Sequence, residues 1–344
     1  MRRIIGIMLC IMLTLSALPG TAESARVFVD SAGRSVELPE TIERVAVSGP
    51  LAQHYVFAIC PDKLVGIAVP WEASAANYFD DAYLALPVLG QVYGGRTMNM
   101  ETLIENGAQL VIDIGEPKDT IAQDLDDLQA QTGIPFVHIS AYMPATGDAF
   151  VALGELLALP EEAARLAAYA DDVYERCAEI AARVPKAEVV YLTGEDGLGV
   201  IARGSYHGEV IDLMANNIAV LPEVSSRGSG NAIDLEQLMV WNPPMILFAP
   251  ESIARDVGAR EIWKDIDAIA RGAYYESPAE PFNWMGFPPA SQRCLGMLWL
   301  TKLLYPEEAQ YDLYAEAAEY FRLFCHFELT EEQYHAIMAH SLPD

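Results

Sequence analysis

The chain has 344 residues, of which 52% are hydrophobic, and a formal net charge of −28 at pH 7. This length is enough for two domains that each bury a core. The strong negative charge argues against nucleic acids and anionic membrane surfaces as partners, because like charges repel. Few cations remain to hold an anionic ligand, so their positions are informative.

Residues 1–22 have the pattern of a secretory signal. Two arginines at positions 2 and 3 are followed by an apolar run, residues 4–18, and by the small residues Gly20, Thr21 and Ala22. This order is typical of a signal peptide that is cleaved near Ala22. An uncleaved membrane anchor is the alternative, and the shortness of the run argues against it. We therefore expect a protein that is soluble after cleavage, in the periplasm or at the cell exterior.

Four cysteines follow the predicted signal. None of them belongs to a C-x-x-C motif, which argues against a zinc ribbon or a thioredoxin-like site. The sequence leaves open whether they form disulfides or remain buried thiols. These residues are Cys60, Cys177, Cys294 and Cys325.

Residues 23–147 are predicted to form a first α/β lobe. Strand-like and helix-like segments alternate here, and this alternation indicates a parallel sheet with both faces covered. The predicted segments are a hairpin at 26–38, strand 44–47, loop 48–50, helix 51–59, strand 64–68, loop 70–98, a helix and strand within 99–112, helix 121–132 and strand 135–139.

Residues 148–184 are predicted to be a single connecting helix. Apolar residues recur here at a spacing of three to four, with one break at Leu159-Pro160. The part after the break, 160–183, would be ~36 Å long as a helix. Such a length suits a rigid connector between two lobes better than a crossover within one small domain.

Residues 185–344 are predicted to form a second α/β lobe, because the alternation of strands and helices resumes. The predicted segments are strands 188–192 and 198–202, loop 203–207, helix 208–215, strand 217–220, loop 223–232, a helix and strand within 234–247, an irregular aromatic and proline-rich stretch at 278–289, and helices 291–305 and 307–325.

Two segments repeat one pattern at a constant offset of 135 positions. NMETLIENGAQLVI, residues 99–112, and DLEQLMVWNPPMIL, residues 234–247, each begin with a polar residue, an apolar residue and a glutamate. An apolar pair, a helix-ending residue and a strand-like run follow in both. The glutamates are Glu101 and Glu236, and the repeat indicates two lobes of similar construction.

The matched glutamates have two interpretations. Asn99 and Asp234 suit the N-cap positions of helices, where a first-turn Glu101 or Glu236 favours the helix dipole by about 0.3–1 kcal/mol. Alternatively, the two carboxylates project from corresponding corners of the lobes and meet a partner that carries arginines. The helix dipole explains either glutamate alone, but it does not explain why two lobes match so closely.

Loops at predicted strand ends contain the candidate ligand-binding residues. Arginine offers paired donors to carboxylate, catecholate or oxyanion groups. A histidine where a loop enters a helix, and aromatic residues in loops, are also typical of binding sites. The candidates are Ser48, Gly49, Pro50, Trp71 and Arg96 in the first lobe, and Arg203, Ser205, Tyr206, His207, Arg227 and Trp284 in the second.

With these segments in order, the chain resembles the substrate-binding proteins of ABC importers for ferric siderophores, haem and vitamin B12. The resemblance covers about residues 26–340. It depends on the order and spacing of RSVELPETIERVAV, DKLVGIA, the two repeated segments, the helical stretch 148–183, SYHGEVIDLM and PFNWMGFPPAS. Residues 243 and 244 are both proline where the family often has Pro-Asp, a departure that affects only a helix–strand turn.

The resemblance implies two doubly wound α/β lobes with mainly parallel sheets, joined by one long helix and closing little around a ligand. It implies that Glu101 and Glu236 pair with arginines of a membrane permease. It also implies no catalytic residues, no permanently bound cofactor and no metal held by the protein itself. We expect a monomer that delivers a metal chelate to the permease.

The resemblance does not name the ligand. A ferric siderophore is our first expectation, haem or cobalamin comes next, and then an oxyanion such as molybdate or a nickel chelate. An exported α/β enzyme is a rival interpretation, but it would need a nucleophile or acid–base constellation that the sequence does not display. A carrier of bare metal ions would need three or four convergent ligands, and the scattered histidines argue against it.

Overall fold

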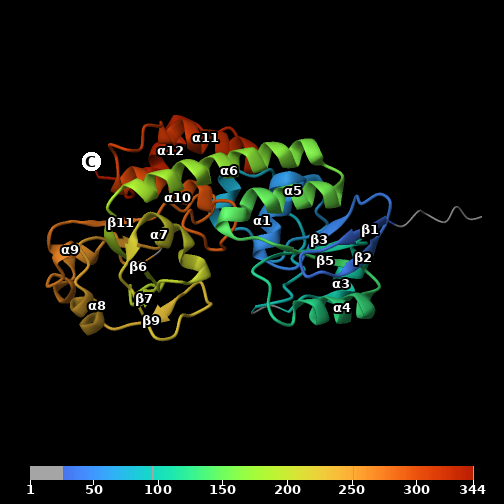
Figure 1. The fold of residues 1–344 in the computed structure, drawn as a ribbon, viewed down its shortest axis with the longest axis horizontal. Helices are drawn as coiled ribbons and strands as arrows, with labels where there is room; N and C mark the ends of the chain where they lie inside the picture. Colours follow the sequence, from blue (N-terminus) through green and yellow to red (C-terminus); the bar gives the residue numbers. More distant parts are fainter. Residues whose placement is uncertain (1–25, 95–96, 251, 344) are drawn as a thin grey trace, which may run out of the picture.

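The computed structural model describes residues 26–94, 97–250 and 252–343. The predicted signal, residues 1–22, and Arg96 lie outside these described residues. The fold is α/β, with two lobes side by side and a layer of helices along one side of both (Figure 1). The predicted fold class is therefore confirmed.

The N-terminal lobe is built on a parallel three-stranded sheet of order β3-β4-β5, and β4 is buried along its whole length. Residues 64–68, predicted as a strand, form only isolated bridges to Val45 and Val88. The elements are β1 (Arg26–Val29) and β2 (Ser35–Leu38), which pair as an antiparallel hairpin, β3 (Val45–Val47), α1 (Pro50–Ile59), α2 (Asp81–Leu84), α3 (Met100–Glu105), β4 (Leu110–Gly115), α4 (Ile121–Thr132) and β5 (Phe136–Ser140).

The predicted connector contains two helices instead of one. α5 (Thr146–Leu157) ends at Ala158, which has a left-handed φ of 56°, and the chain then reverses direction into α6 (Pro160–Arg183) (Figure 1). Gly154 allows the two helices to pack closely, because a Cβ atom there would lie 2.3 Å from Cβ of Ala163. The connecting helix is therefore α6 alone, and α5 packs back along it.

The C-terminal lobe has a mixed sheet of order β11-β10-β6-β7-β9, in which β6, β10 and β11 are parallel and β7 and β9 are antiparallel to their neighbours. The elements are β6 (Glu188–Thr193), β7 (Gly199–Val200), α7 (Glu209–Met214), β8 (Asn216–Asn217), which pairs with β6, β9 (Asn231–Ala232), α8 (Leu235–Trp241), β10 (Ile246–Phe248), α9 (Asp267–Ala270), β11 (Tyr274–Glu276), α10 (Arg293–Leu304), α11 (Leu313–Phe324) and α12 (Glu331–Met338).

The last helices bind both lobes together. α10 and α11 pack against α6, and α11 also packs against α1 of the N-terminal lobe. His326, just after α11, has Nε2 3.0 Å from the carbonyl oxygen of Phe57. One apolar core runs without interruption from β3 and α1 through α5 and α6 to α10 and α11. The final part of the predicted second lobe is therefore shared between the lobes.

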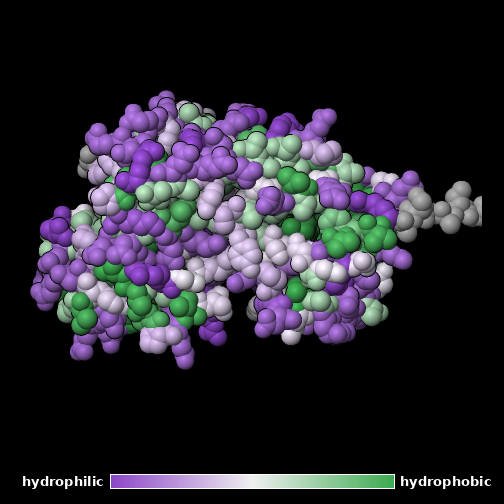
Figure 2. All heavy atoms as spheres, viewed as in Figure 1, coloured by the Kyte–Doolittle hydropathy of each residue, from purple (hydrophilic) through white to green (hydrophobic). Residues whose placement is uncertain are grey.

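The described surface is mostly hydrophilic, with apolar patches at the β1–β2 hairpin and around α8 and β9 (Figure 2). In the described part of the chain, no helix is both long enough and apolar enough to cross a membrane. The four cysteines are buried free thiols, and burial raises the pKa of Cys60 and Cys294 to about 12. The disulfide alternative is not observed.

Candidate functional site

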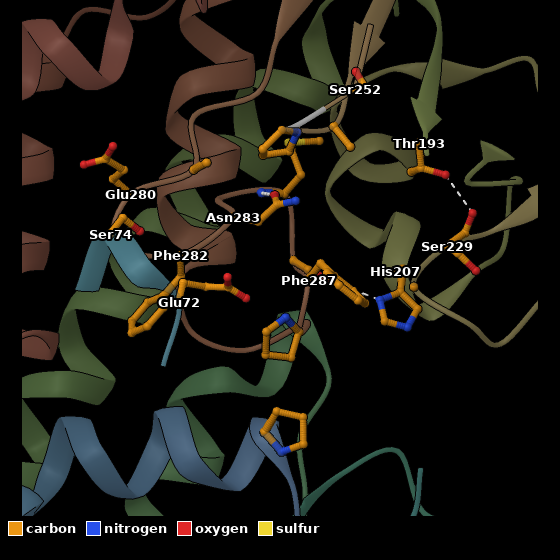
Figure 3. A pocket seen from close by; sticks show the side chains of 18 of the residues that line it. Glu72, Ser74, Thr193, His207, Ser229, Ser252, Glu280, Phe282, Asn283 and Phe287 are labelled. Carbon is orange, nitrogen blue, oxygen red and sulfur yellow. Dashed lines mark hydrogen bonds between the residues drawn. The ribbon is translucent and has the colours of Figure 1, made fainter. Parts of the chain in front are cut away.

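A cavity of about 770 Å³ lies between the two lobes (Figure 3). A cavity of this volume suits a ligand of the size of a drug or cofactor. Its N-terminal wall is formed by the first turn of α1 and the loop 69–74, and its C-terminal wall by β6 and by segments at 228–229, 249–250, 252–255 and 276–288.

Aromatic rings from both lobes meet on one side of the cavity. The ring centroid of His54 lies 4.0 Å from that of Phe282, and the Trp71 centroid lies 5.9 Å from the Phe282 centroid. The indole Nε1 of Trp71 donates a hydrogen bond to the carbonyl oxygen of Tyr83 at 3.1 Å, which orients the ring. Burial lowers the pKa of His54 to about 3, so this imidazole is uncharged at neutral pH. The cavity therefore offers an uncharged aromatic surface.

The opposite side is formed by loops of the C-terminal lobe. Nδ1 of His207 lies 3.2 Å from the carbonyl oxygen of Gly286, and burial lowers the pKa of His207. The Phe287 ring is 58% exposed and lies against the backbone of Gly228, where a Cβ atom would come within 1.8 Å of the ring. Phe287 therefore presents an aromatic face to a ligand only because residue 228 has no side chain.

The charged side chains of the lining are mainly acidic. Among the described lining residues, Arg255 is the single arginine or lysine, and its Nε lies 3.0 Å from Oε2 of Glu276. Glu280 accepts a hydrogen bond from the hydroxyl of Tyr78 in the other lobe. The carboxylate of Glu72 extends into the open space between Phe282 and Phe287 (Figure 3). The lining thus contains three carboxylates and one guanidinium.

Three of the residues predicted to bind ligand line this cavity: Pro50, Trp71 and His207. The cavity lies between the loop after β3 and the loop before α7, the region in which the sequence led us to expect the ligand. The remaining predicted residues do not line it. These are Ser48, Gly49, Arg203, Ser205, Tyr206, Arg227 and Trp284, while Arg96 lies outside the described residues.

Ser48 serves the interior of the N-terminal lobe. Its hydroxyl donates to Oδ1 of Asp113, and Oδ2 of the same carboxylate lies 2.7 Å from Nδ1 of the fully buried His138. Because the carboxylate stands between the hydroxyl and the imidazole, the imidazole is not placed to accept the hydroxyl proton. Nε2 of His138 lies 3.2 Å from Oγ of Ser140, so the group links the residue after β3 with β4 and β5.

The two arginines predicted in the second lobe lie on the surface, outside the lining of the cavity. Arg203 is exposed, and its guanidinium donates to the carbonyl oxygen of Asn217 at 2.7 Å and to Oδ1 of Asn216 at 2.6 Å. Arg227 is exposed on the loop next to the lining residues Gly228 and Ser229. The sequence could not predict that these arginines lie outside the cavity, because surface and cleft arginines have the same local sequence pattern.

Trp284 and Ser205 are buried instead of facing the cavity. Trp284 is fully buried, and its Nε1 donates to the carbonyl oxygen of Glu280 at 2.9 Å. The Ser205 hydroxyl accepts from the backbone N–H of His207 and so begins a short turn. Gly49 is the N-cap of α1 and positions the lining residue Pro50. These three residues support the cavity without facing it.

A buried polar cluster lies at the lobe interface, beside the cavity segment that includes Gly286. The Arg293 side chain is 2% exposed, and its Nη1 donates to Oε2 of Glu209. The same carboxylate accepts from the backbone N–H of Met143 in the N-terminal half at 3.4 Å. Tyr206 lies under the guanidinium, with 5.3 Å between Cζ and the ring centroid, and donates its hydroxyl to Ala141. Tyr206 therefore joins the lobes and does not contact the cavity.

Sequence reasoning missed the acidic and amide residues of the lining. Glu72, Glu276, Glu280 and Asn283 all lie in or beside the two irregular stretches that were identified as loops, 70–98 and 278–289. In those loops, arginines and aromatic residues were the expected ligand contacts. In the described part of the chain, no group of three or more His, Cys, Asp or Glu side chains is arranged to hold a metal ion.

Comparison with known proteins shows which family has this architecture. The family model described as periplasmic binding protein matches residues 62–281. The molybdate-binding protein MolA of Haemophilus influenzae is 23% identical over 348 residues, which cover 90% of this chain and 93% of the relative.

Two solved structures share the fold over most of their length. An ABC transporter solute binding protein from Sulfurospirillum deleyianum has a TM-score of 0.83 at 23% identity, covering 91% of this chain and 99% of its own. MolA of H. influenzae bound to molybdate has a TM-score of 0.71 at 19% identity, covering 89% and 99%. The chain therefore belongs to the periplasmic binding protein family, as its resemblance in sequence implied, and it is a substrate-binding protein and not an enzyme.

Proposed function

We propose that this protein captures a metal chelate, in the first place a ferric siderophore, outside the cytoplasmic membrane and delivers it to the permease of an ABC importer. The main support for this proposal is the cavity of about 770 Å³ between the lobes, which has aromatic rings on both walls. Such a volume and such rings suit an organic ligand that surrounds its metal. A small ion would leave most of this space to water.

The construction of the molecule supports a receptor that closes little. α6 and the last helices share one apolar core with both lobes, so separating the lobes would expose buried apolar surface. The hydrogen bonds Tyr78–Glu280 and Tyr206–Ala141 cross between the lobes. We therefore propose a preformed site that needs only small movements to bind its ligand.

We also propose that Glu101 and Glu236 dock the protein on the permease. Asn99 accepts from the backbone N–H of Thr102 at 3.1 Å, and Asp234 accepts from that of Gln237 at 2.8 Å, so both glutamates lie in the first turn of an equally capped helix. Both glutamates are exposed. α3 and α8 lie on the side of the molecule opposite α6, one on each lobe (Figure 1).

Apolar residues accompany the two glutamates. Ile104 is 52% exposed, and Met239, at the corresponding position 135 residues later, is 40% exposed. An exposed apolar residue beside a carboxylate is typical of a surface that a partner covers. The match between the lobes suits a permease with two similar halves.

Molybdate is a second candidate ligand, because the curated relative is a molybdate-binding protein. Haem and cobalamin remain candidates on the size of the cavity. A thermal shift screen distinguishes them, since a ligand that binds only the folded state raises the melting temperature by mass action. A rise with a ferric siderophore supports the proposal. A rise with molybdate alone replaces the metal chelate by an oxyanion.

Delivery is tested with the double variant Glu101→Ala/Glu236→Ala. We expect unchanged ligand affinity and melting temperature, because exposed carboxylates contribute little to stability, together with reduced binding to the reconstituted permease. A matched control is Glu161→Ala/Glu332→Ala, which removes exposed first-turn glutamates of α6 and α12 on the other side of the molecule. Wild-type permease binding in the first double variant would leave the glutamates with a helix-dipole role only.

A further inference from the structure

We infer that the cavity takes a chelate of net positive charge and disfavours anionic chelates and free oxyanions. This inference names the ligand class of the proposed function and rests on it. It departs from the sequence-based expectation that arginines would hold an anionic ligand. The charges that face the cavity carry the inference.

Carboxylates outnumber cations in the described lining. Glu72, Glu276 and Glu280 face one guanidinium, that of Arg255, which gives a formal sum of 1 − 3 = −2. Arg255 is already paired with Glu276 at 3.0 Å, and its side chain is 70% exposed. It is therefore both neutralised and screened by water, and an anion would have to compete with Glu276 for it.

The other titratable groups of the lining add no positive charge at neutral pH. Burial lowers the pKa of His54 to about 3 and also lowers the pKa of His207. Burial raises the pKa of Tyr191, so its phenol stays uncharged. The neutral histidines leave the acidic balance of the cavity unchanged.

Just outside the lining, the buried cation Arg293 is paired with Glu209, and Glu116 adds a further negative charge. Glu116 follows β4, and its charge opposes the burial that lowers the pKa of His207 and adds to the burial that raises the pKa of Glu209. Lys118 sits 3.6 Å above the ring of Tyr93, where the π face holds its ammonium group. Arg227 is exposed beside Gly228 and does not line the cavity.

One feature favours an anion. The N-terminus of α1, at Pro50, lies at the cavity, and no side chain caps it. A helix end of this kind is equivalent to about half a positive charge. Against a sum of −2 from the lining side chains, it leaves the cavity acidic by more than one charge.

The aromatic walls suit a cation as well. An ammonium group over an aromatic face is attracted by the ring quadrupole, and the attraction grows where water is excluded. Phe282 and Phe287 offer such faces on either side of the carboxylate of Glu72 (Figure 3), and Trp71 is a further aromatic residue of the lining. A cationic chelate would thus place its charge at Glu72 and its apolar linkers on the rings.

The test uses one ferric trihydroxamate with three different ends. Ferrioxamine B carries a free ammonium group, its N-acetyl derivative is neutral there, and its N-succinyl derivative carries a carboxylate. Dissociation constants are measured by quenching of tryptophan fluorescence, at low and high ionic strength. We expect affinity to decrease from ammonium to acetyl to succinyl, and the difference to shrink as salt shortens the Debye length.

Variants of Glu72 localise the effect. Glu72→Gln should weaken binding of the ammonium form about threefold to tenfold, as for a partly screened ion pair, and change the acetyl form less than about twofold. Glu72→Lys should reverse the preference between the ammonium and succinyl forms. Glu223→Gln, an exposed glutamate outside the lining, is the matched control and should change neither.

Each outcome decides a different point. Preference for the succinyl form, or saturable binding of ferric enterobactin, haemin or molybdate more tightly than the ammonium form, overturns the inference. With a chelate still bound, the proposed function then stands. An unchanged charge preference in Glu72→Gln also overturns the assignment of the charge to this side chain. Failure of every chelate to bind overturns the proposed function together with the inference.

Discussion

Replacing Arg293 by methionine should destabilise the protein by removing a buried cation from the interface of the lobes. The Arg293 side chain is 2% exposed, its Nη1 is paired with Glu209, and its Nε donates to the carbonyl oxygen of Ala290 at 3.2 Å. Methionine has a similar length and keeps the apolar contacts of the stem. The change therefore removes the charge and its hydrogen bonds more than it removes volume.

The expected loss follows from the group that is left behind. Breaking a buried ion pair by removing one partner costs about 3–5 kcal/mol, because the other charge remains without compensation. Here Glu209 is 22% exposed and keeps some water, and Nη2 of Arg293 has no hydrogen-bond partner among the described residues. Both points reduce the loss, so we expect the free energy of unfolding to fall by about 2–3 kcal/mol at pH 7.

The loss should depend on pH in a defined direction. Burial raises the pKa of Glu209, and Arg293 opposes this shift. A carboxyl with a raised pKa stabilises the folded state below its unfolded pKa, and this contribution is lost as pH rises through the folded value. Without Arg293 the pKa of Glu209 rises further. The difference between Arg293→Met and wild type should therefore shrink as pH falls from 7 toward 5.

Urea unfolding of four proteins measures these quantities: wild type, Arg293→Met, Glu209→Gln and the double variant. Because the two side chains share one interaction, we expect a coupling energy of about 1–2 kcal/mol. A loss below about 0.5 kcal/mol in Arg293→Met, or strict additivity in the double variant, would refute the assignment of this pair as an energetic link between the lobes.

Three further predictions follow from single contacts. Burial lowers the pKa of His54 to about 3, so the unfolded state binds a proton first as the pH falls, and the free energy of unfolding of wild type should decrease by about 2 kcal/mol between pH 7 and pH 5 through this residue. Urea unfolding of His54→Phe at the two pH values should show a correspondingly smaller decrease. An equal decrease would contradict the burial of this imidazole. In Gly154→Ala the new Cβ would lie 2.3 Å from that of Ala163, and this overpacking should lower the free energy of unfolding by about 1–3 kcal/mol and with it the melting temperature. An unchanged melting temperature would show that α5 and α6 separate freely. Gly228→Ala should displace the Phe287 ring and weaken ligand binding by about threefold or more, with little change in melting temperature. Unaltered affinity would exclude Phe287 from the surface that contacts the ligand.

Local sequence determined the repeated helix–strand units. The N-caps of α3 and α8 use side chains that accept from the backbone three residues later, so Asn99 and Asp234 act within their own segments. Strand β10 is a continuous apolar run and β4 is apolar apart from Asp113 and Gly115, a composition that indicates burial on both faces. These features need no information from the rest of the chain, and they were sufficient to indicate two lobes of one family.

The tertiary structure decided how the connector is built. The sequence showed a break at Leu159-Pro160, but a proline there is compatible with either a kink or a reversal. The reversal passes through Ala158 in the left-handed conformation, which costs free energy in a residue other than glycine, and close packing of Gly154 against Ala163 stabilises it. Both conditions arise from contact between helices, so no pattern within one helix could predict them.

The tertiary structure also decided which charges face the ligand. Arg203 and Glu72 both lie in loops at predicted strand ends, and nothing within either loop shows which way its side chain points. Asn216 and Asn217, brought next to Arg203 by the pairing of β8 with β6, hold its guanidinium away from the cavity. Glu72 stays at the cavity and its carboxylate extends into it. The sequence by itself determined the family, whereas the sign of the charge within the cavity depends on contacts between segments far apart in the chain.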